Sequence, residues 1–402
     1  MKDLMYPAYQ KFYSAICALE KFDKENDFFD NISSLDKFFS EYRNVTFVLQ
    51  KSIAHTKYMS VYDEIMPKYL NHWFVEKRNM ISKVKPFDYI KIIKISVYCP
   101  NGEIGVMDRK FTIEDEENYS LFSDEIRNWL MSFKNETVCF SVDFSFYENN
   151  SDEELISKLN DGVYAMNEFL YAMQCEIKDK SSLCERIRKK IKKKLPRFKI
   201  KGLFMNVDYE YYPQKKYFRK ATQIDTLFEE KTNKNQRLED TKLKQLIMPG
   251  ENYFKAFVKT NLIFQTTQLM PTIWVVYNDD TFDIKLFRSD TKTTFYRKIN
   301  DTVKDIENSN VKEIYSMFAY SSDNLNIDNK ANFGEKLVSN DLKEYLVFIK
   351  IDRDLNQEEY VFEGDQLKDY KYISKLLQQG PKTKLDYAAS DFQPVLKAFE
   401  AK

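Results

Sequence analysis

The feature that most constrains the fold of this chain is a change in the spacing of its apolar residues near Tyr89. Before that point they recur every three or four residues, as on one face of a helix. After it they alternate with polar residues, as in a β-strand. The chain therefore combines a helical first part with later strands, and we expect an α+β protein. The helical stripe consists of Leu35, Phe38, Phe39, Tyr42, Val45, Leu49 and Ile53.

The first part predicts a small helical bundle, and the strands after it begin with a hairpin. Asn101-Gly102 lies between two alternating segments, and this residue pair is a strong signal for a β-hairpin. A later alternating segment predicts a strand with one buried face. The expected helices are 9–22, 35–53, 61–83 and 121–133, and the expected strands are 90–97, 104–106 and 138–146.

A capping box of Ser151 and Glu154 predicts the start of another helix. The apolar residues behind it step by three and four, over fewer heptads than a sustained coiled coil needs. Two interpretations remain open: the stripe packs against another helix of this chain, or it contacts a partner protein or a second copy. The stripe consists of Ile156, Leu159, Val163, Met166, Leu170 and Met173.

The segment 181–202 has the most uneven charge in the chain. Leu183, Ile187, Ile191 and Leu195 recur at strict fours and leave the other faces of the expected helix to lysine and arginine, until Pro196 ends it. Glu185 is its single acid, and a Tyr-rich stretch with further cations follows.

Such a surface favours contact with several phosphates, an interaction that depends on salt and is blind to base sequence. Tyrosines beside it would stack on unpaired bases. The alternative is a solvated face that pairs with the acids of the preceding helix. The predicted nucleic-acid-binding residues are Arg186, Arg188, Lys189, Lys190, Lys192, Lys193, Lys194, Arg197, Lys199, Lys201, Tyr211, Tyr212, Lys215, Lys216, Arg219 and Lys220.

The last part predicts a two-layer α+β domain, with strands at 273–277, 282–287, 311–320 and 345–351 and a helix at 295–306. The length of 402 residues suits several domains. We expect a helical bundle over 1–86, an α+β segment with a helical hairpin ending in the basic helix over 87–202, a Tyr-rich stretch and polar connector over 203–250, and the C-terminal domain over 251–402.

Glycine and histidine are scarce, with eight and two residues. The glycines are scattered, so no phosphate-binding loop or dinucleotide fingerprint is present. His55 and His72 have no cysteine or carboxylate pattern around them, and the five cysteines lack metal-ligand spacing. We therefore expect no catalytic residue, no metal site and no cofactor.

The formal net charge is zero, so a preference for polyanions must come from local clusters of charge. The N-terminus has no apolar core of a signal peptide, and no stretch is long and apolar enough to cross a membrane. We expect a cytoplasmic protein that does not bind membranes.

The runs FFSEYRNVTFVLQKSIA and HWFVEKRNMISKVKPF resemble the helical HEPN family (higher eukaryotes and prokaryotes nucleotide-binding), which is common in bacterial toxin and phage-defence systems. Ribonucleases of this family carry an Arg, often followed by a polar residue such as Asn, and a His four to six residues further on. Arg78-Asn79 matches the first half, whereas Lys83, Val84 and Lys85 stand where the His would fall.

RNA cleavage needs a group that exchanges a proton near neutral pH, and a lysine with a pKa near ~10.4 is a poor substitute. The resemblance therefore implies that Arg78 and Lys83 contact phosphate without catalysis. The alternative is a helix end whose cations face water.

Asp283-Ile284-Lys285, with Asp279 and Asp280 upstream, has part of the pattern of metal-dependent nucleases. The acids lie in the turn of the same expected hairpin, which is too close for that site. Alternating strand polarity explains Asp283 and Lys285 as solvent-facing residues.

The leading hypothesis is a non-enzymatic or catalytically degenerate module that binds RNA or single-stranded nucleic acid through the basic helix. By resemblance, it would act in bacterial anti-phage defence or a toxin-type system. The alternative is a protein-interaction or scaffold subunit of a multi-protein complex, and an enzyme with an unusual site comes third.

Overall fold

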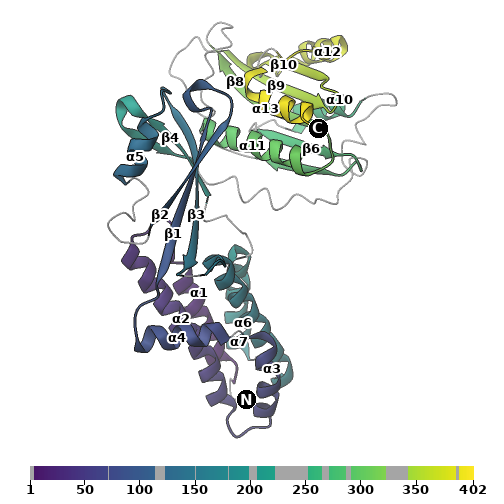
Figure 1. The fold of residues 1–402 in the computed structure, drawn as a ribbon. Coiled ribbons are helices and arrows are strands. Elements are labelled where there is room, and N and C mark those ends of the chain that lie inside the picture. Colours follow the sequence, from purple (N-terminus) through teal and green to yellow (C-terminus); the bar gives the residue numbers. More distant parts are fainter. Residues whose placement is uncertain are drawn as a thin grey trace. The chain divides into compact units, whose positions relative to one another are not determined.

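The computed structural model shows an α+β protein, as the change in apolar spacing predicts (Figure 1). It forms two compact units, each assembled from separate stretches of the chain. The first comprises Met1–Lys94, Arg109–Trp129 and Asp143–Asn206, and the second comprises Ile95–Asp108, Leu130–Val142 and Val207–Lys402. The structure describes residues 4–70, 72–113, 123–149, 151–179, 181–198, 206–221, 252–264, 271–286, 291–322, 343–385 and 389–402. Of the Tyr-rich stretch and polar connector expected over 203–250, only 206–221 lies within these ranges.

Six helices of the first unit pack together beside its strand residues (Figure 1). Helix α2 packs against α1, α3 and α4, while α6 packs against α3 and α7 packs against α1. The stripe predicted on α2 is buried along its whole length. The six helices are α1 (Tyr6–Leu19), α2 (Phe28–Ile53), α3 (Tyr58–Tyr69), α4 (His72–Lys83), α6 (Leu155–Ile177) and α7 (Ser182–Lys194).

Two local expectations in this unit are wrong. The single helix expected over 61–83 is two helices, because Leu70 after α3 is extended (φ −99°, ψ 125°). Pro67, which has no backbone N–H, weakens the last turn before that break. Helix α6 does not begin at Ser151, because Glu154 is its N-cap: the Glu154 carboxylate accepts a 2.7 Å hydrogen bond from the Ser157 amide.

A five-stranded sheet has the order β2-β1-β3-β4-β5. Strands β1 and β2 form the predicted hairpin, but Cys99–Gly105 makes a longer connection than a two-residue turn. Asn101 (φ 55°) is held there because its backbone amide donates to Asn135 Oδ1 at 2.6 Å. The strands are β1 (Tyr89–Tyr98), β2 (Val106–Ile113), β3 (Val138–Glu148), β4 (Asn206–Tyr212) and β5 (Tyr217–Lys220), with α5 (Asp124–Met131) between β2 and β3.

Strand β3 differs from the half-buried strand that its alternation predicts. Cys139 and Ser141, on the polar side of the pattern, are buried as well as their apolar neighbours. Burial raises the pKa of the Cys139 thiol to about 12. The Ser141 hydroxyl lies 2.9 Å from that of Tyr98. Small polar side chains therefore fill a covered face that the pattern assigns to solvent.

The second sheet, in the second unit, has the order β10-β9-β8-β6-β7 and is covered by helices on both faces (Figure 1). Helices α11 and α13 pack on one face, and α10 and α12 pack on the other. The expected two-layer domain thus has three layers, because β8 and β9 bury apolar residues on both sides. The elements are α10 (Tyr253–Phe264), β6 (Thr272–Tyr277), β7 (Phe282–Leu286), α11 (Lys292–Asn308), β8 (Val311–Ser322), β9 (Lys343–Asp352), β10 (Gln357–Glu363), α12 (Tyr370–Gln379) and α13 (Ala389–Glu400).

Candidate nucleic-acid interface

Helix α7 is anchored through one side and exposes the other. The Ser181 hydroxyl caps its N-terminus by accepting a 3.2 Å hydrogen bond from the Cys184 amide. Cys184, Ile187 and Ile191 are buried, and α7 packs against α1. Leu183, expected in the buried stripe, is exposed, and Cys184 takes its place. The cations of α7 therefore extend from a rigidly held helix.

We call the exposed cations of α7 the α7 basic face. Within the described part of the chain, none of them makes an ion pair with a carboxylate, and the acids of α6 do not cover them. Four of the five are spaced by three and four residues, so they share one side of the helix. The α7 basic face consists of Arg186, Lys189, Lys190, Lys192 and Lys193.

Two other cations of α7 have partners within the protein. Lys194 forms an ion pair with Glu20, the residue that follows α1, and the hydrogen bond between them raises the pKa of the lysine. The Arg188 guanidinium lies 4.4 Å from the ring centroid of Tyr171 on α6 and 3.4 Å from Gln174 Oε1. Both residues therefore help to hold α7 in place.

Tyr171 is a candidate that the sequence pattern does not single out. Its side chain is 49% exposed, and Arg188 places it beside α7. In the sequence it follows Leu170 of the buried stripe and has no cation within three residues on either side. The contact between neighbouring helices makes it part of a cationic surface, and a single helical pattern does not reveal that.

For three predicted residues after α7 the position of the side chain is not described. Lys199 and Lys201 lie outside the described residues. Arg197 lies in the short 3₁₀ turn Leu195–Phe198, and the structure does not describe its side chain.

The Tyr-rich stretch forms the β4–β5 hairpin, which belongs to the second unit. Tyr211 is buried and its ring stacks on Phe218 at 4.3 Å, so the prediction that Tyr211 stacks on bases is wrong. Tyr212 is half-buried and donates a 2.8 Å hydrogen bond to Glu210. Arg219 lies 3.7 Å from the same buried carboxylate. The exposed cations of the hairpin are Lys215, Lys216 and Lys220.

A buried charged cluster in the second unit joins β4 to α11. The Asp208 carboxylate accepts hydrogen bonds from Arg297 Nε at 2.9 Å and Nη2 at 3.0 Å, and from the Thr294 hydroxyl at 2.8 Å. Burial acts to lower the pKa of Arg297, but Asp208 outweighs it, so that this pKa rises above its ordinary value. This cluster is satisfied internally and has a structural role.

The family-like motif lies on α4. The half-buried Arg78 donates a 3.2 Å hydrogen bond to Asn79 Oδ1, and Lys83 is exposed at the last turn. His72 begins the same helix, and its Nδ1 lies 3.0 Å from Glu76.

The acidic hairpin of β6 and β7 is held by pairs within the unit. Asp283 accepts a 2.9 Å hydrogen bond from Tyr277, Lys285 pairs with Asp305, and Asp280 lies 3.2 Å from Lys312. Among the described residues, no group of His, Cys, Asp and Glu side chains is arranged to hold a metal ion. Lys285 thus faces Asp305 on α11 instead of solvent.

The apolar stripe of α6 lies inside the first unit. Leu159, Val163, Met166, Leu170 and Met173 have no exposed surface, and only Ile156 is partly exposed. These side chains pack within this chain, so the prediction that they contact a partner is wrong for this folded state.

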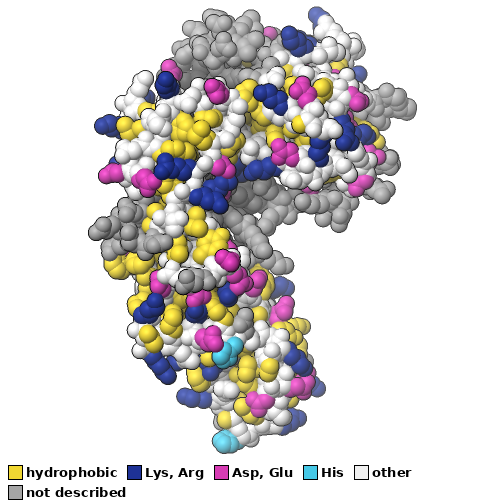
Figure 2. Space-filling view, viewed as in Figure 1, with side chains coloured by type: hydrophobic (Ala, Val, Ile, Leu, Met, Phe, Trp, Pro, Cys, Tyr) yellow, Lys and Arg dark blue, Asp and Glu magenta, His cyan; other side chains and the backbone are white. Residues whose placement is uncertain are grey.

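The charges on the face drawn in Figure 2 are of both signs and interspersed. That face therefore carries no large electrostatic field of one sign. The exposed cations of the α7 basic face are the observation that favours an anionic ligand. Across the described helices, none has the length and apolar character that a membrane span requires. Comparisons with protein-family models, curated proteins and solved structures found no match for this chain.

Proposed function

We propose that this protein binds single-stranded nucleic acid, RNA in particular, through the α7 basic face. The observation that carries the proposal is the exposure of five cations on one helix without carboxylate partners among the described residues. Each cation that contacts a phosphate releases condensed counterions, which drives binding without base specificity. Because α7 is capped and packed on α1, little ordering is needed when a ligand binds.

Tyr171 supports a preference for single strands over duplexes. An exposed tyrosine ring beside phosphate-binding cations can stack on an unpaired base, whose face is accessible only outside a duplex. Arg188 holds this ring next to α7. The resemblance to HEPN domains is consistent with an RNA ligand. It also favours a bacterial defence or toxin-type context, which is part of this proposal.

The test is fluorescence anisotropy of labelled oligouridine and of a matched RNA duplex with the full chain. We expect Lys189→Glu with Lys193→Glu to weaken oligouridine binding by at least about tenfold, because two phosphate contacts become repulsive. The matched control is Lys37→Glu with Lys51→Glu, which changes the net charge equally on exposed positions of α2. Equal losses in both double variants would contradict a role for α7.

A second arm tests the ring. Tyr171→Ala should weaken oligouridine binding by about 1–3 kcal/mol and leave duplex binding unchanged, whereas Tyr171→Phe should retain both. A third arm replaces Lys215 and Lys216 by Glu. An effect there equal to that of the α7 variant would assign the contact to the β4–β5 hairpin as well.

A further inference from the structure

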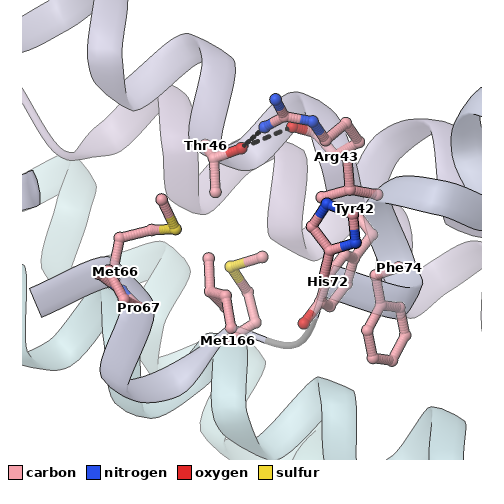
Figure 3. A pocket seen from close by; sticks show the side chains of 10 residues that line it. Tyr42, Arg43, Thr46, Met66, Pro67, His72, Phe74 and Met166 are labelled. Atoms are coloured by element: carbon pink, nitrogen blue, oxygen red, sulfur yellow. Dashed lines mark hydrogen bonds between the residues drawn. The ribbon is translucent and has the colours of Figure 1, made fainter.

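A cavity of about 300 Å³ lies in the first unit (Figure 3), and no residue of α7 is among those that line it. Side chains from α2, α3, α4 and α6 line it; Met66 is partly exposed at its wall, whereas Met166 lies behind the wall with no exposed surface. Its volume is at the lower end of the range for small-molecule sites. It is too small for a folded partner or a polymer, so its occupant would be a small molecule. The lining residues are Tyr42, Arg43, Thr46, Met66, Pro67, Leu70, His72, Phe74, Val75 and Met166.

The lining of this cavity has a positive charge and no negative charge. It contains Arg43 and no Asp or Glu. The Arg43 guanidinium donates to the Thr46 hydroxyl and lies 4.0 Å from the ring centroid of Phe47, both uncharged partners. Among the described residues, Arg43 has no ion pair with a carboxylate.

The surroundings of Arg43 disfavour its charge. Burial lowers its pKa, and the nearby positive charge of Arg78 acts in the same direction, while the Tyr62 hydroxyl acts against them. A half-buried guanidinium beside a second arginine is stabilised when an anion enters. Carboxylates suit this role because they accept two parallel hydrogen bonds from one guanidinium.

We propose that this cavity binds a small amphipathic carboxylate. The carboxylate contacts Arg43, near Thr46, and the apolar body lies against the partly exposed Met66, Leu70 and Val75. Met66 has a flexible, polarisable side chain, which adapts to an apolar ligand of irregular shape. The ring of Phe74, which is buried, is also part of the lining. This site is independent of nucleic-acid binding by α7.

The test uses the full chain labelled with ¹³C at its methionine methyl groups. It is titrated with straight-chain carboxylates from butanoate to decanoate and with the corresponding primary amides as neutral controls. We expect saturable shifts of the Met66 and Met166 signals, while the exposed Met107 and Met131 stay unchanged. The amides should bind at least about tenfold more weakly, because they carry no charge for Arg43.

Two variants localise the effect. Arg43→Met keeps apolar volume and removes the charge, so carboxylates and amides should bind it equally. Leu70→Trp, at a partly exposed lining position, fills the cavity and should abolish binding of both. The proposal is overturned if no carboxylate shifts Met66 and Met166, or if the carboxylate preference persists in Arg43→Met. If Arg43→Met does not fold, the amide comparison in the wild-type chain decides: equal binding of amides and carboxylates also overturns the proposal.

Discussion

Two groups of basic residues in this protein have opposite environments. The α7 basic face is exposed and has no carboxylate partners among the described residues. Arg297, on α11 of the second unit, has a side chain only 11% exposed and is bonded through two nitrogen atoms to the buried Asp208. The first group is available to an external anion, and the second already has its anion within the fold. Burial and pairing, not the density of basic residues, therefore separate a candidate binding surface from a structural cluster.

The largest expected effect concerns the buried pair. Asp208→Ala leaves the Arg297 guanidinium with only the partly exposed Asp301 carboxylate, at 3.8 Å. We therefore expect the free energy of unfolding of the second unit to fall by about 3 kcal/mol, at the lower end of the cost of breaking a buried pair. Hydrogen exchange of the α11 amides measures this directly, with the α1 amides as an internal reference. Lys190→Ala on the α7 basic face should change stability by less than about 0.5 kcal/mol. Similar effects of the two substitutions would contradict the contrast between the groups.

A third environment for a cation is found at Lys91. Lys91 on β1 is 2% exposed, and its amine lies 5.3 Å from the ring centroid of Phe144. Burial lowers its pKa to about 8, against the opposing effect of Asp23 and Glu25. Below pH 8 the lysine is charged in both the folded and the unfolded chain. Between about pH 8 and 10.4 the unfolded chain keeps the Lys91 proton that the folded chain has released. The free energy of unfolding should therefore rise with pH in that window.

The size of this effect is about 1.6 kcal/mol between pH 8 and 9.5. Urea unfolding of the wild-type chain and of Lys91→Met over this range measures it, because the variant lacks the titrating group. Taking the difference between the two curves removes the contribution of the tyrosines. Parallel curves would show that Lys91 titrates normally in the folded protein.

The sequence predicts much of the fold because apolar spacing reflects local geometry. The stripe on α2, the β1–β2 hairpin and the pair β6 and β7 all follow it. What it does not predict depends on contacts between distant segments. The strand β3 is covered on both sides at Ser141, and helices α10 and α12 cover a second face of the C-terminal sheet.

The candidate interface could be predicted in part for the same reason. A run of lysine and arginine on a helix with one apolar side implies exposure of the other sides, and Arg186 to Lys193 follow that rule apart from Arg188. Tyr211 is not exposed as the sequence predicts, because its ring stacks on Phe218 from the neighbouring strand. Tyr171 and the Arg43 cavity depend on packing between helices, so no local pattern marks them.

The salt dependence of oligouridine binding shows whether nucleic acid contacts the α7 basic face. For single strands the slope of log K against log salt is about −0.7 per phosphate contacted, so five cations give a limit of about −3.5. We predict a wild-type slope between about −2 and −3.5, and a slope smaller by about 0.7 in magnitude in each of Lys189→Met and Lys193→Met. A wild-type slope near zero, or slopes that these substitutions leave unchanged, would contradict binding through the α7 basic face.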